Sequence, residues 1–220
     1  MPAPASSIKI FFASSNAGKL AEFRALAQIQ PAAPSADHKT SAIEIPAVEV
    51  ELLPGFASLP TFPEDAPTFA ENALGKALYF SQLTVELVFA DDSGLVVPAL
   101  NGAPGVHSAR YAGPDATSEQ RNAKLLSELS GKSAADRAAY FCCVIAVVKK
   151  GNPVAIISNR ADGEILEAPR GTAGFGYDPI FYFPALGKTF AELTREEKNQ
   201  YSHRGKAFRR MLASLPLFFV

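Results

Sequence analysis

The sequence predicts a mixed α/β fold in which helices flank one mixed β-sheet. Short apolar segments typical of buried strands alternate with amphipathic helical segments, and no unit of this pattern repeats. The 220 residues are 48% hydrophobic and 20% charged, so the chain can bury a sizeable core. Its length suits one domain, or two lobes that share one cleft. We therefore expect residues 1–220 to form a single domain of the α/β (mixed α+β) class.

The first third of the chain predicts a strand, a helix and a second strand. Residues 8–13 are apolar and partly β-branched, as buried strands are. Asn16 suits a helix N-cap, and the apolar face of the helix after it consists of Leu20, Phe23 and Leu26. Residues 31–63 are rich in proline and alanine, apart from a predicted strand near residues 48–53.

The middle of the chain predicts a helix followed by a strand. Thr68 and Glu71 have the spacing of a capping box, which opens a helix that runs to about Ser81. Residues 85–90 form the next apolar, partly β-branched segment. We expect this strand to end in residues 91–94, which include the two aspartates, and residues 95–97 to continue in extended form.

The second half predicts a helix, a hairpin, a loop and a last helix. Residues 117–120 can open a helix that buries Leu125, Leu126 and Leu129. Residues 138–148 and 154–158 flank a good hairpin turn. Residues 171–178 form a glycine-rich loop. The last helix is expected to start at Ser202 and to bury Phe208, Met211, Leu212 and Leu215.

Charge and hydropathy argue against several classes of protein. The net charge of −1 gives no bulk attraction to nucleic acid or to an anionic membrane. The longest apolar run, residues 138–148, is far shorter than the ~20 residues that span a bilayer. The N-terminal segment lacks the features of a signal peptide. Cys142 and Cys143 are adjacent and are expected to be reduced. We expect a cytoplasmic protein that binds neither nucleic acid nor membranes.

Three basic side chains stand in the first turns of two predicted helices. Lys19 follows the first strand, and His203 and Arg204 open the last helix. Cations at a helix N-terminus oppose the helix dipole, at a cost of roughly 0.3–1 kcal/mol each. They are favourable there when an anion binds at the same place. Side chains that point away into solvent are the alternative, but three such cations in two helices favour an anionic ligand.

Acidic residues form a second cluster. Asp91 and Asp92 are neighbours on a strand, where successive side chains point to opposite faces, so only one of them can easily enter a given cleft. Glu64 and Asp65 lie in the loop before the second helix. Carboxylates beside an anion site are typical ligands of Mg²⁺. A turn stabilised by the Asp-Ser-Gly sequence is the alternative. Glu71 needs no ligand, because the capping box explains it.

A phenylalanine between two glycines is the third candidate. The run from Gly174 to Asp178 lacks the GxGxxG spacing and the strand-to-helix context of a dinucleotide site. Phe175 is suited to stacking on a base, and a buried aromatic ring is the equal alternative. The chain has no metal-binding His/Cys spacing, no GxSxG elbow and no GxxxxGK[ST] loop. His107 is interpreted as structural.

Together these segments resemble the inosine triphosphate pyrophosphatase family, which comprises Mg²⁺-dependent hydrolases of deaminated purine nucleoside triphosphates. The resemblance extends from residue 8 to about residue 212, and the motifs follow the order of the family. They are residues 14–19, 68–73 with 76–77, 91–95, 105 with 108–113, 174–179, 189–193, and 198 with 202–204.

The resemblance implies a two-lobed fold with a central nucleotide cleft, usually a homodimer, and Mg²⁺ as cofactor. The implied reaction is hydrolysis of ITP, dITP or XTP to the monophosphate and pyrophosphate, which cleanses the nucleotide pool. Asp92 matches the catalytic base, Lys19 a catalytic cation on the phosphates and Ser93 a substrate contact. Asp92 and Glu64 match Mg²⁺ ligands. The implied phosphate loop is Ser14, Ser15, Asn16, Ala17, Gly18 and Lys19, and the implied base site is Phe175, Gly176, Tyr177, Asp178, Lys198, His203 and Arg204.

The implied base site agrees with the chemistry of inosine and xanthosine. Both carry an acceptor oxygen at C6, to which Lys198, His203 and Arg204 can donate. Adenine has an amino donor there, so ATP would leave protein donors unpaired at about 1–3 kcal/mol each. Guanine shares the oxygen, so its rejection depends on the C2 amino group.

Two other functions stay open at this point. The same phosphate site would serve a pyrophosphatase for other modified or pyrimidine triphosphates. A nucleotide-binding module that does not hydrolyse its ligand is the second alternative, and the presence of Lys19, Asp92 and Lys198 argues against it. Ser15 and Ala173 replace glycines that are usual in the family. Residues 31–63 are longer and richer in proline than we expect for the family, and are either a lid or surface decoration.

Overall fold

The computed structural model describes residues 7–29 and 47–218, and it contains a seven-stranded sheet in the order β2-β1-β3-β4-β5-β6-β7. β1 runs parallel to both of its neighbours, β2 and β3, and every later pair is antiparallel. The predicted mixed sheet is therefore confirmed. The strands are β1 Ile8–Phe12, β2 Val48–Leu52, β3 Leu87–Val96, β4 Ala138–Lys149, β5 Asn152–Ile165, β6 Phe181–Phe183 and β7 Lys188–Thr189.

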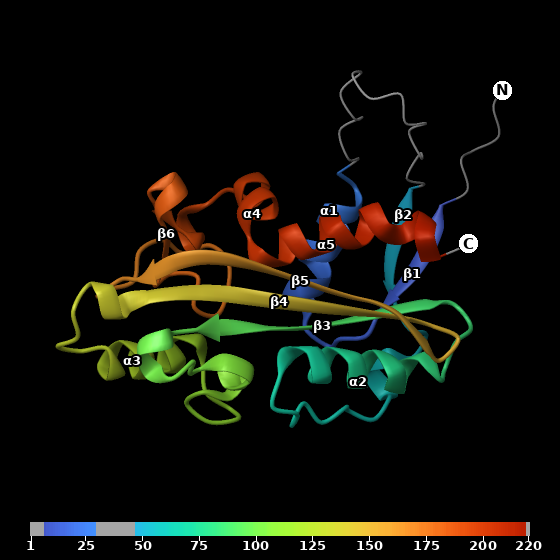
Figure 1. Cartoon of the computed structure of the whole chain (residues 1–220), viewed down its shortest axis with the longest axis horizontal. Helices are drawn as coiled ribbons and strands as arrows, with labels where there is room; N and C mark the ends of the chain where they lie inside the picture. The colour runs from blue at the N-terminus through green and yellow to red at the C-terminus, as the bar shows by residue number, and fades with distance from the viewer. Residues whose placement is uncertain (1–6, 30–46, 219–220) are drawn as a thin grey trace, which may run out of the picture.

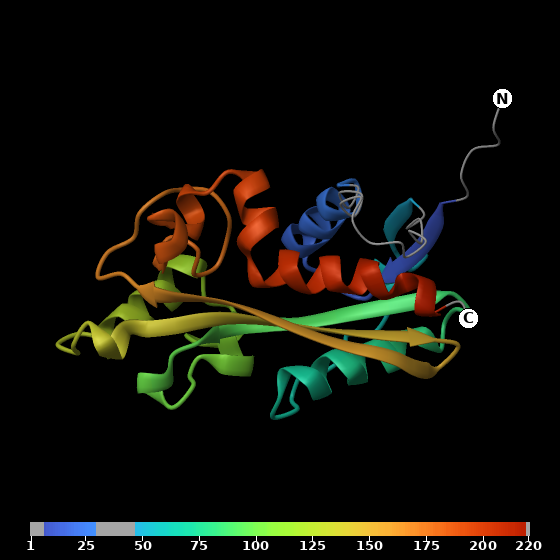
Figure 2. The ribbon, with the colours of Figure 1, turned by 45° about the horizontal axis from the view of Figure 1, so that its top comes forward.

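Five α-helices of the described chain cover the sheet on two sides. In Figure 1, α2 and α3 lie below the long strands β3, β4 and β5, while α1, α4 and α5 lie above them. The turned view places α5 and α2 on opposite sides of the twisted sheet, with α1 beside α5 (Figure 2). The bounds of the helices are α1 Ala17–Ala27, α2 Phe69–Ser81, α3 Ser118–Glu128, α4 Arg195–Tyr201 and α5 His203–Ser214.

The predicted N-caps begin the helices as the sequence indicates. Asn16 accepts a hydrogen bond from the main chain of Lys19 at 3.0 Å, and Ser202 caps α5 in the same way. Thr117 opens α3 with a complete capping box. Thr68 caps α2, but the Glu71 carboxylate accepts its bond from the Thr68 hydroxyl instead of from the main chain.

Two predicted boundaries are wrong. The strand that we expected to end in residues 91–94 does not end there, because β3 continues without interruption to Val96. The reason is that β4 pairs with all ten residues of β3, so the ladder extends through the acidic pair. β5 is likewise longer than the predicted residues 154–158, and the helix α4 is not predicted at all.

Apolar side chains pack in two regions along the sheet, in agreement with two lobes. Near β1 and β2, one cluster lies beneath α1 and α5 and a second lies beneath α2, on opposite faces of the sheet. At the other end, a third cluster joins α3 to β6 and to the 3₁₀ helix Phe190–Glu192. The long strands β3 and β4 contribute residues to both regions, and the polar site lies between them.

The remaining expectations concern cysteines, membranes and the proline-rich segment. Cys142 is half-buried and Cys143 is buried, and both are free thiols as predicted. In the part of the chain that the structure describes, no helix is both long and apolar enough to cross a membrane. In the segment 31–63, which we expected to be a lid or surface decoration, residues 31–46 lie outside the described residues, and the rest contains β2 and the 3₁₀ helix Phe56–Ser58.

Candidate active site

A cavity of about 330 Å³ lies between the two packing regions and contains most of the predicted site residues. Ala17 and Gly18 are the predicted residues that do not line it. The predicted residues that line it are Ser14, Ser15, Asn16, Lys19, Glu64, Asp92, Ser93, Phe175, Gly176, Tyr177, Asp178, Lys198, His203 and Arg204. The structure thus brings together segments that are far apart in the sequence.

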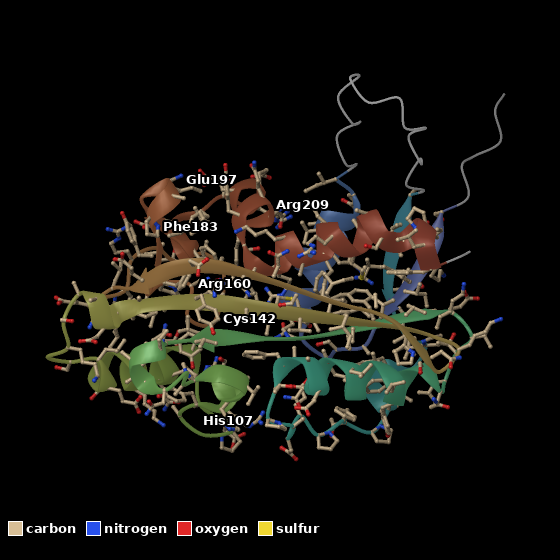
Figure 3. The ribbon with its side chains drawn as sticks, in the orientation of Figure 1. His107, Cys142, Arg160, Phe183, Glu197 and Arg209 are labelled. Atoms are coloured by element: carbon tan, nitrogen blue, oxygen red, sulfur yellow. The ribbon has the colours of Figure 1, made fainter. Side chains whose placement is uncertain are left out.

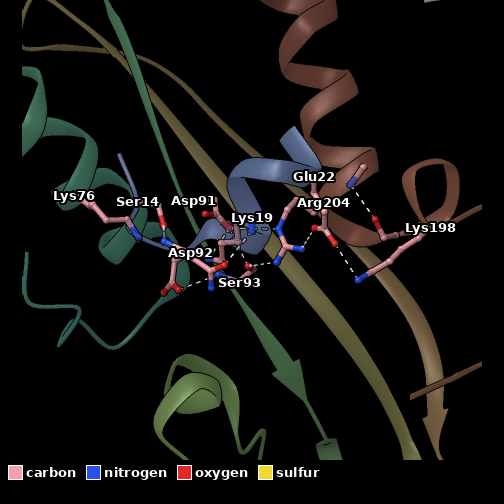
Figure 4. A network of polar contacts seen from close by, with 12 residues as sticks. Ser14, Lys19, Glu22, Lys76, Asp91, Asp92, Ser93, Lys198 and Arg204 are labelled. Atoms are coloured by element: carbon pink, nitrogen blue, oxygen red, sulfur yellow. Dashed lines mark hydrogen bonds and ion pairs between the residues drawn. The ribbon is translucent and has the colours of Figure 1, made fainter. Parts of the chain in front are cut away.

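The adjacent carboxylates of β3 point to opposite faces of the sheet, as the strand geometry predicts. Asp91 faces α1 and α5, where its Oδ2 lies 2.8 Å from Nζ of Lys19 and 3.8 Å from Nε of Arg204. Asp92 faces α2 and lines the cavity, and its Oδ2 accepts a hydrogen bond of 3.0 Å from Asn72. Figure 4 shows this division, with Lys76 on the side of Asp92.

The two carboxylates have opposite pKa shifts because their surroundings differ. Burial raises the pKa of Asp91, but the charges of Lys19, Arg204 and Lys76 outweigh it and lower the pKa to about 2. Burial also raises the pKa of Asp92, and the nearby charge of Glu64 adds to the effect, so this pKa reaches about 6 despite Lys19. Asp91 is a permanent counter-ion, whereas Asp92 has the affinity for a proton that a general base needs near neutral pH.

The N-terminus of α1 lines the cavity beside the acidic strand. Asn16 caps this helix, and the main-chain nitrogen of Asn16 donates to Oγ of Ser14 at 3.2 Å. No acidic residue stands in the first turn of the helix. A capped N-terminus with a lysine beside it is a favourable place for phosphate.

Carboxylates hold the basic side chains at the other end of the cavity in place. Glu22 of α1 forms ion pairs with Lys198, at 2.9 Å, and with Arg204. Asp178 accepts a bond of 2.6 Å from Lys198 and one of 2.8 Å from the main chain of Phe175. Burial raises the pKa of Asp178 despite the charge of Lys198. Asp178 therefore fixes the loop and the lysine within the protein, besides lining the cavity.

Phe175 is 38% exposed, so the buried-ring interpretation is wrong. The ring lines the cavity, with Nζ of Lys198 4.8 Å and Cζ of Arg204 5.5 Å from its centroid. It also meets the phosphate loop: a Cβ on Gly18 would lie only 3.3 Å from a ring carbon. A flat aromatic surface thus stands beside two fixed hydrogen-bond donors.

His203 is held by stacking. Its ring is 4.7 Å from that of Phe141, with 9° between the planes. Burial, together with the charges of Arg204 and Lys198, holds the pKa of His203 well below its usual range, so the ring is neutral. A neutral imidazole keeps one N–H donor. His107, in contrast, is exposed on the 3₁₀ helix η3 (Gly105–Arg110), away from the sheet (Figure 3).

Sequence reasoning assigned no role to five charged or polar side chains that build the site. Glu22 gave no signal except its position one turn after Lys19 on the same helix face. Lys76 forms an ion pair with Glu64, and the guanidinium of Arg110 donates to the main-chain oxygen of Glu64 at 2.7 Å. Lys76, Asn72 and Arg110 lie within the motifs that carry the family resemblance, and this position could have identified them as site residues. Arg121 also lines the cavity.

Comparisons with known proteins agree with this geometry. The chain matches the Ham1 family over residues 10–214. A protein of Geobacillus kaustophilus named dITP/XTP pyrophosphatase is 48% identical over 203 residues, 92% of each chain. One of Nitrosomonas europaea with the same name is 45% identical over 212 residues, 94% of each chain. The structure of a HAM1 protein from Coxiella burnetii matches with a TM-score of 0.78 and 39% identity, covering 96% of this chain and 99% of that chain. The chain belongs to the Ham1 family.

Proposed function

We propose that the protein is a Mg²⁺-dependent nucleoside triphosphate pyrophosphohydrolase that acts on dITP, XTP and ITP. The products are the nucleoside monophosphate and pyrophosphate, and the reaction removes deaminated purines from the nucleotide pool. The names of its relatives support the class of reaction. The observation that carries the proposal is the cavity, which the carboxylates of Asp92 and Glu64 line together with Lys19 and the capped N-terminus of α1.

The donor set of the cavity suits Mg²⁺. Asp92 and Glu64 both line the cavity, and the charge of Glu64 raises the pKa of Asp92. Mg²⁺ is commonly held by one or two carboxylates together with substrate phosphates and water. Asp92 and Glu64, which is also paired with Lys76, would hold the ion, and its charge would offset that of the two carboxylates. When bound, it would neutralise charge on the triphosphate.

In the proposed reaction, Asp92 accepts a proton from the water that attacks the α-phosphorus. The bond between the α-phosphorus and the bridging oxygen breaks, and its electron pair leaves with pyrophosphate. Asn72 holds Oδ2 of Asp92, and the main-chain nitrogen of Ser93 donates to Oδ1 at 2.9 Å, so the carboxylate is fixed in orientation. Lys19 supplies positive charge that Asp91 holds in place, where negative charge develops on the phosphates.

The base is proposed to stack on Phe175 and to present its C6 oxygen to the donors beside the ring. Lys198 and Arg204 are both tied to Glu22, so they are already oriented before substrate binds. An adenine amino group at the same place would leave these donors unpaired. Discrimination against ATP thus follows from a fixed array of donors.

Side-by-side assays of pyrophosphate release from dITP, XTP, GTP and ATP, with and without Mg²⁺, test the proposal. We expect metal-dependent release from dITP and XTP, and little from ATP or GTP. Release from another base would keep the phosphate chemistry and contradict the proposed base site. Tight binding of dITP without release would identify a nucleotide-binding module, and release of orthophosphate would contradict cleavage at the α-phosphorus.

A further inference from the structure

A chain of buried hydrogen bonds connects the strand that carries Asp92 to the loop that carries Phe175. Its centre is Ser108, a residue of η3 that is 8% exposed. The hydroxyl of Ser108 accepts a bond of 2.9 Å from the main-chain nitrogen of Leu95 and donates one of 2.7 Å to the carbonyl of Gly105. Leu95 is three residues after Asp92 on β3. The serine side chain is therefore attached to the acidic strand.

The main chain of the same residue is attached to the base loop. The carbonyl oxygen of Ser108 accepts a bond of 2.9 Å from the hydroxyl of Tyr177, whose side chain is buried. Tyr177 is two residues after Phe175. One residue thus contacts the acidic strand through its side chain and the base loop through its backbone.

The contact between η3 and the acidic strand is too close to absorb movement. A Cβ on Gly94 would lie 2.4 Å from Oγ of Ser108 and 2.5 Å from the carbonyl oxygen of Gly105. Real atoms do not approach so closely, so η3 reaches the strand only because residue 94 is glycine. A displacement of Ser108 toward β3 must displace the strand as well.

We propose that Ser108 is a positioning residue that links the base loop to Asp92. A base seated on Phe175 fixes Tyr177, which fixes Ser108 and, through Leu95, the segment of β3 that holds Asp92. The identity of the base then influences the chemical step as well as binding. This inference rests on the proposed function, since it concerns how the same site works.

A double-mutant cycle tests the link. Tyr177→Phe removes only the hydroxyl, and Ser108→Ala removes only the bonds to Leu95 and Gly105. Tyr177→Phe alters the base loop, yet we expect it to lower kcat for dITP severalfold, because the link transmits the change to Asp92. Ser108→Ala alters the contact with the strand, yet we expect it to lower the ratio of kcat/KM for dITP to kcat/KM for dATP, because the link transmits the change to the base loop. The fold-decrease in kcat of the double variant should be smaller than the product of the fold-decreases of the two single variants, by a factor of about three or more.

Two matched variants separate this link from a general loss of packing. Tyr201→Phe removes the hydroxyl of a tyrosine that packs against the apolar cluster containing Tyr177. Ser81→Ala removes a buried serine hydroxyl that donates to the main-chain oxygen of Leu78 at 2.7 Å. We expect these two to change kcat and the base ratio by less than twofold. The proposal would be overturned if Tyr177→Phe and Ser108→Ala changed kcat no more than the two control variants do. It would also be overturned if the fold-decrease in kcat of the double variant equalled the product of the two single fold-decreases.

Amide hydrogen exchange examines the link without turnover. Tyr177→Phe should speed exchange at Leu95 at least threefold relative to exchange at the core residue Val147, which corrects for global stability. Tyr201→Phe should leave that ratio unchanged. An unchanged Leu95 ratio in Tyr177→Phe would overturn the link even if wild-type protein hydrolyses dITP. Absence of hydrolysis by wild-type protein would instead overturn the proposed function, and the exchange ratio would still decide whether Ser108 joins the two segments.

Discussion

Nζ of Lys19 lies 2.8 Å from Oδ2 of Asp91, while the adjacent Asp92 points away from this pair into the cavity. Asp91 is buried and Lys19 is half-buried, and Arg204 approaches the same carboxylate. Asp91 thus compensates Lys19, the cation proposed for the phosphates, and shares with Glu22 the compensation of Arg204. Asp91 pairs with Lys19 and Asp92 faces the cavity because neighbouring side chains on one strand point to opposite faces of the sheet.

Replacing Asp91 by Asn should destabilise the fold, because it leaves the mostly buried side chain of Lys19 without its counter-ion and leaves Arg204 with Glu22 alone. Breaking a buried pair in this way costs about 3–5 kcal/mol of unfolding free energy. Urea denaturation of Asp91→Asn measures it. Asp162→Asn is the control, since the pair of Asp162 with Arg160 is largely exposed and should be worth at most about 1 kcal/mol. Equal effects of the two substitutions would contradict the role of Asp91.

The same carboxylate should make stability depend on acid pH. Its pKa is about 2 in the folded protein and takes the ordinary value of 3.8 in the unfolded chain, so the folded protein holds fewer protons between these values. The stabilisation is complete above about pH 4 and is lost as the pH falls toward 2. The difference in unfolding free energy between wild type and Asp91→Asn should therefore shrink over that interval. A constant difference would show that Asp91 does not titrate there.

Asp92 should titrate near pH 6 in the metal-free protein, well above its ordinary value of 3.8. Carbon NMR of the side-chain carboxyl group measures this pKa directly. Because a bound cation favours the ionised form, Mg²⁺ should lower the pKa, and the affinity for Mg²⁺ should fall as the pH drops below about 6. If Asp92 titrated near its ordinary pKa of 3.8 without metal, and Mg²⁺ did not change that pKa, the roles of Asp92 as general base and as Mg²⁺ ligand would both be contradicted.

Arg204→Ala should reduce discrimination against ATP, because it removes a donor for the C6 oxygen. The dITP to ATP ratio of kcat/KM should fall about tenfold, the effect of one unpaired donor. A ratio is unaffected by the fraction of folded protein, which matters because the variant also leaves Glu22 with one partner fewer. Arg210→Ala, on the exposed face of the same helix, should leave the ratio unchanged. An unchanged ratio in Arg204→Ala would remove Arg204 from base recognition.

Local patterns predicted the elements that are specified by nearby residues. Asn16, Thr117 and Ser202 begin helices because each satisfies a main-chain N–H three residues later. The uninterrupted continuation of β3 past Asp91 and Asp92 to Val96 was not predictable in this way. Acidic residues are unusual in a buried strand, and pairing with β4 decides the matter.

Site residues that lie within a sequence motif were predictable. Residues whose role depends on contacts with distant elements of the fold were not. Glu22 is one acidic residue among many in the sequence, and it becomes significant only because α1 packs beside α4 and α5. Ser108 acquires its role from contacts with residues 13 positions before it and 69 positions after it. The homodimer, the cytoplasmic location and the absence of nucleic-acid binding stay predictions.

Asp92→Asn tests the account most directly, because it removes the charge of the proposed base and keeps its shape. We expect pyrophosphate release from dITP to fall at least about a hundredfold, in line with the loss of a general base. Calorimetric titration with dIMP, the product without pyrophosphate, should show an affinity within about threefold of wild type. Wild-type turnover in Asp92→Asn would contradict the central claim that Asp92 carries the chemistry of this cavity.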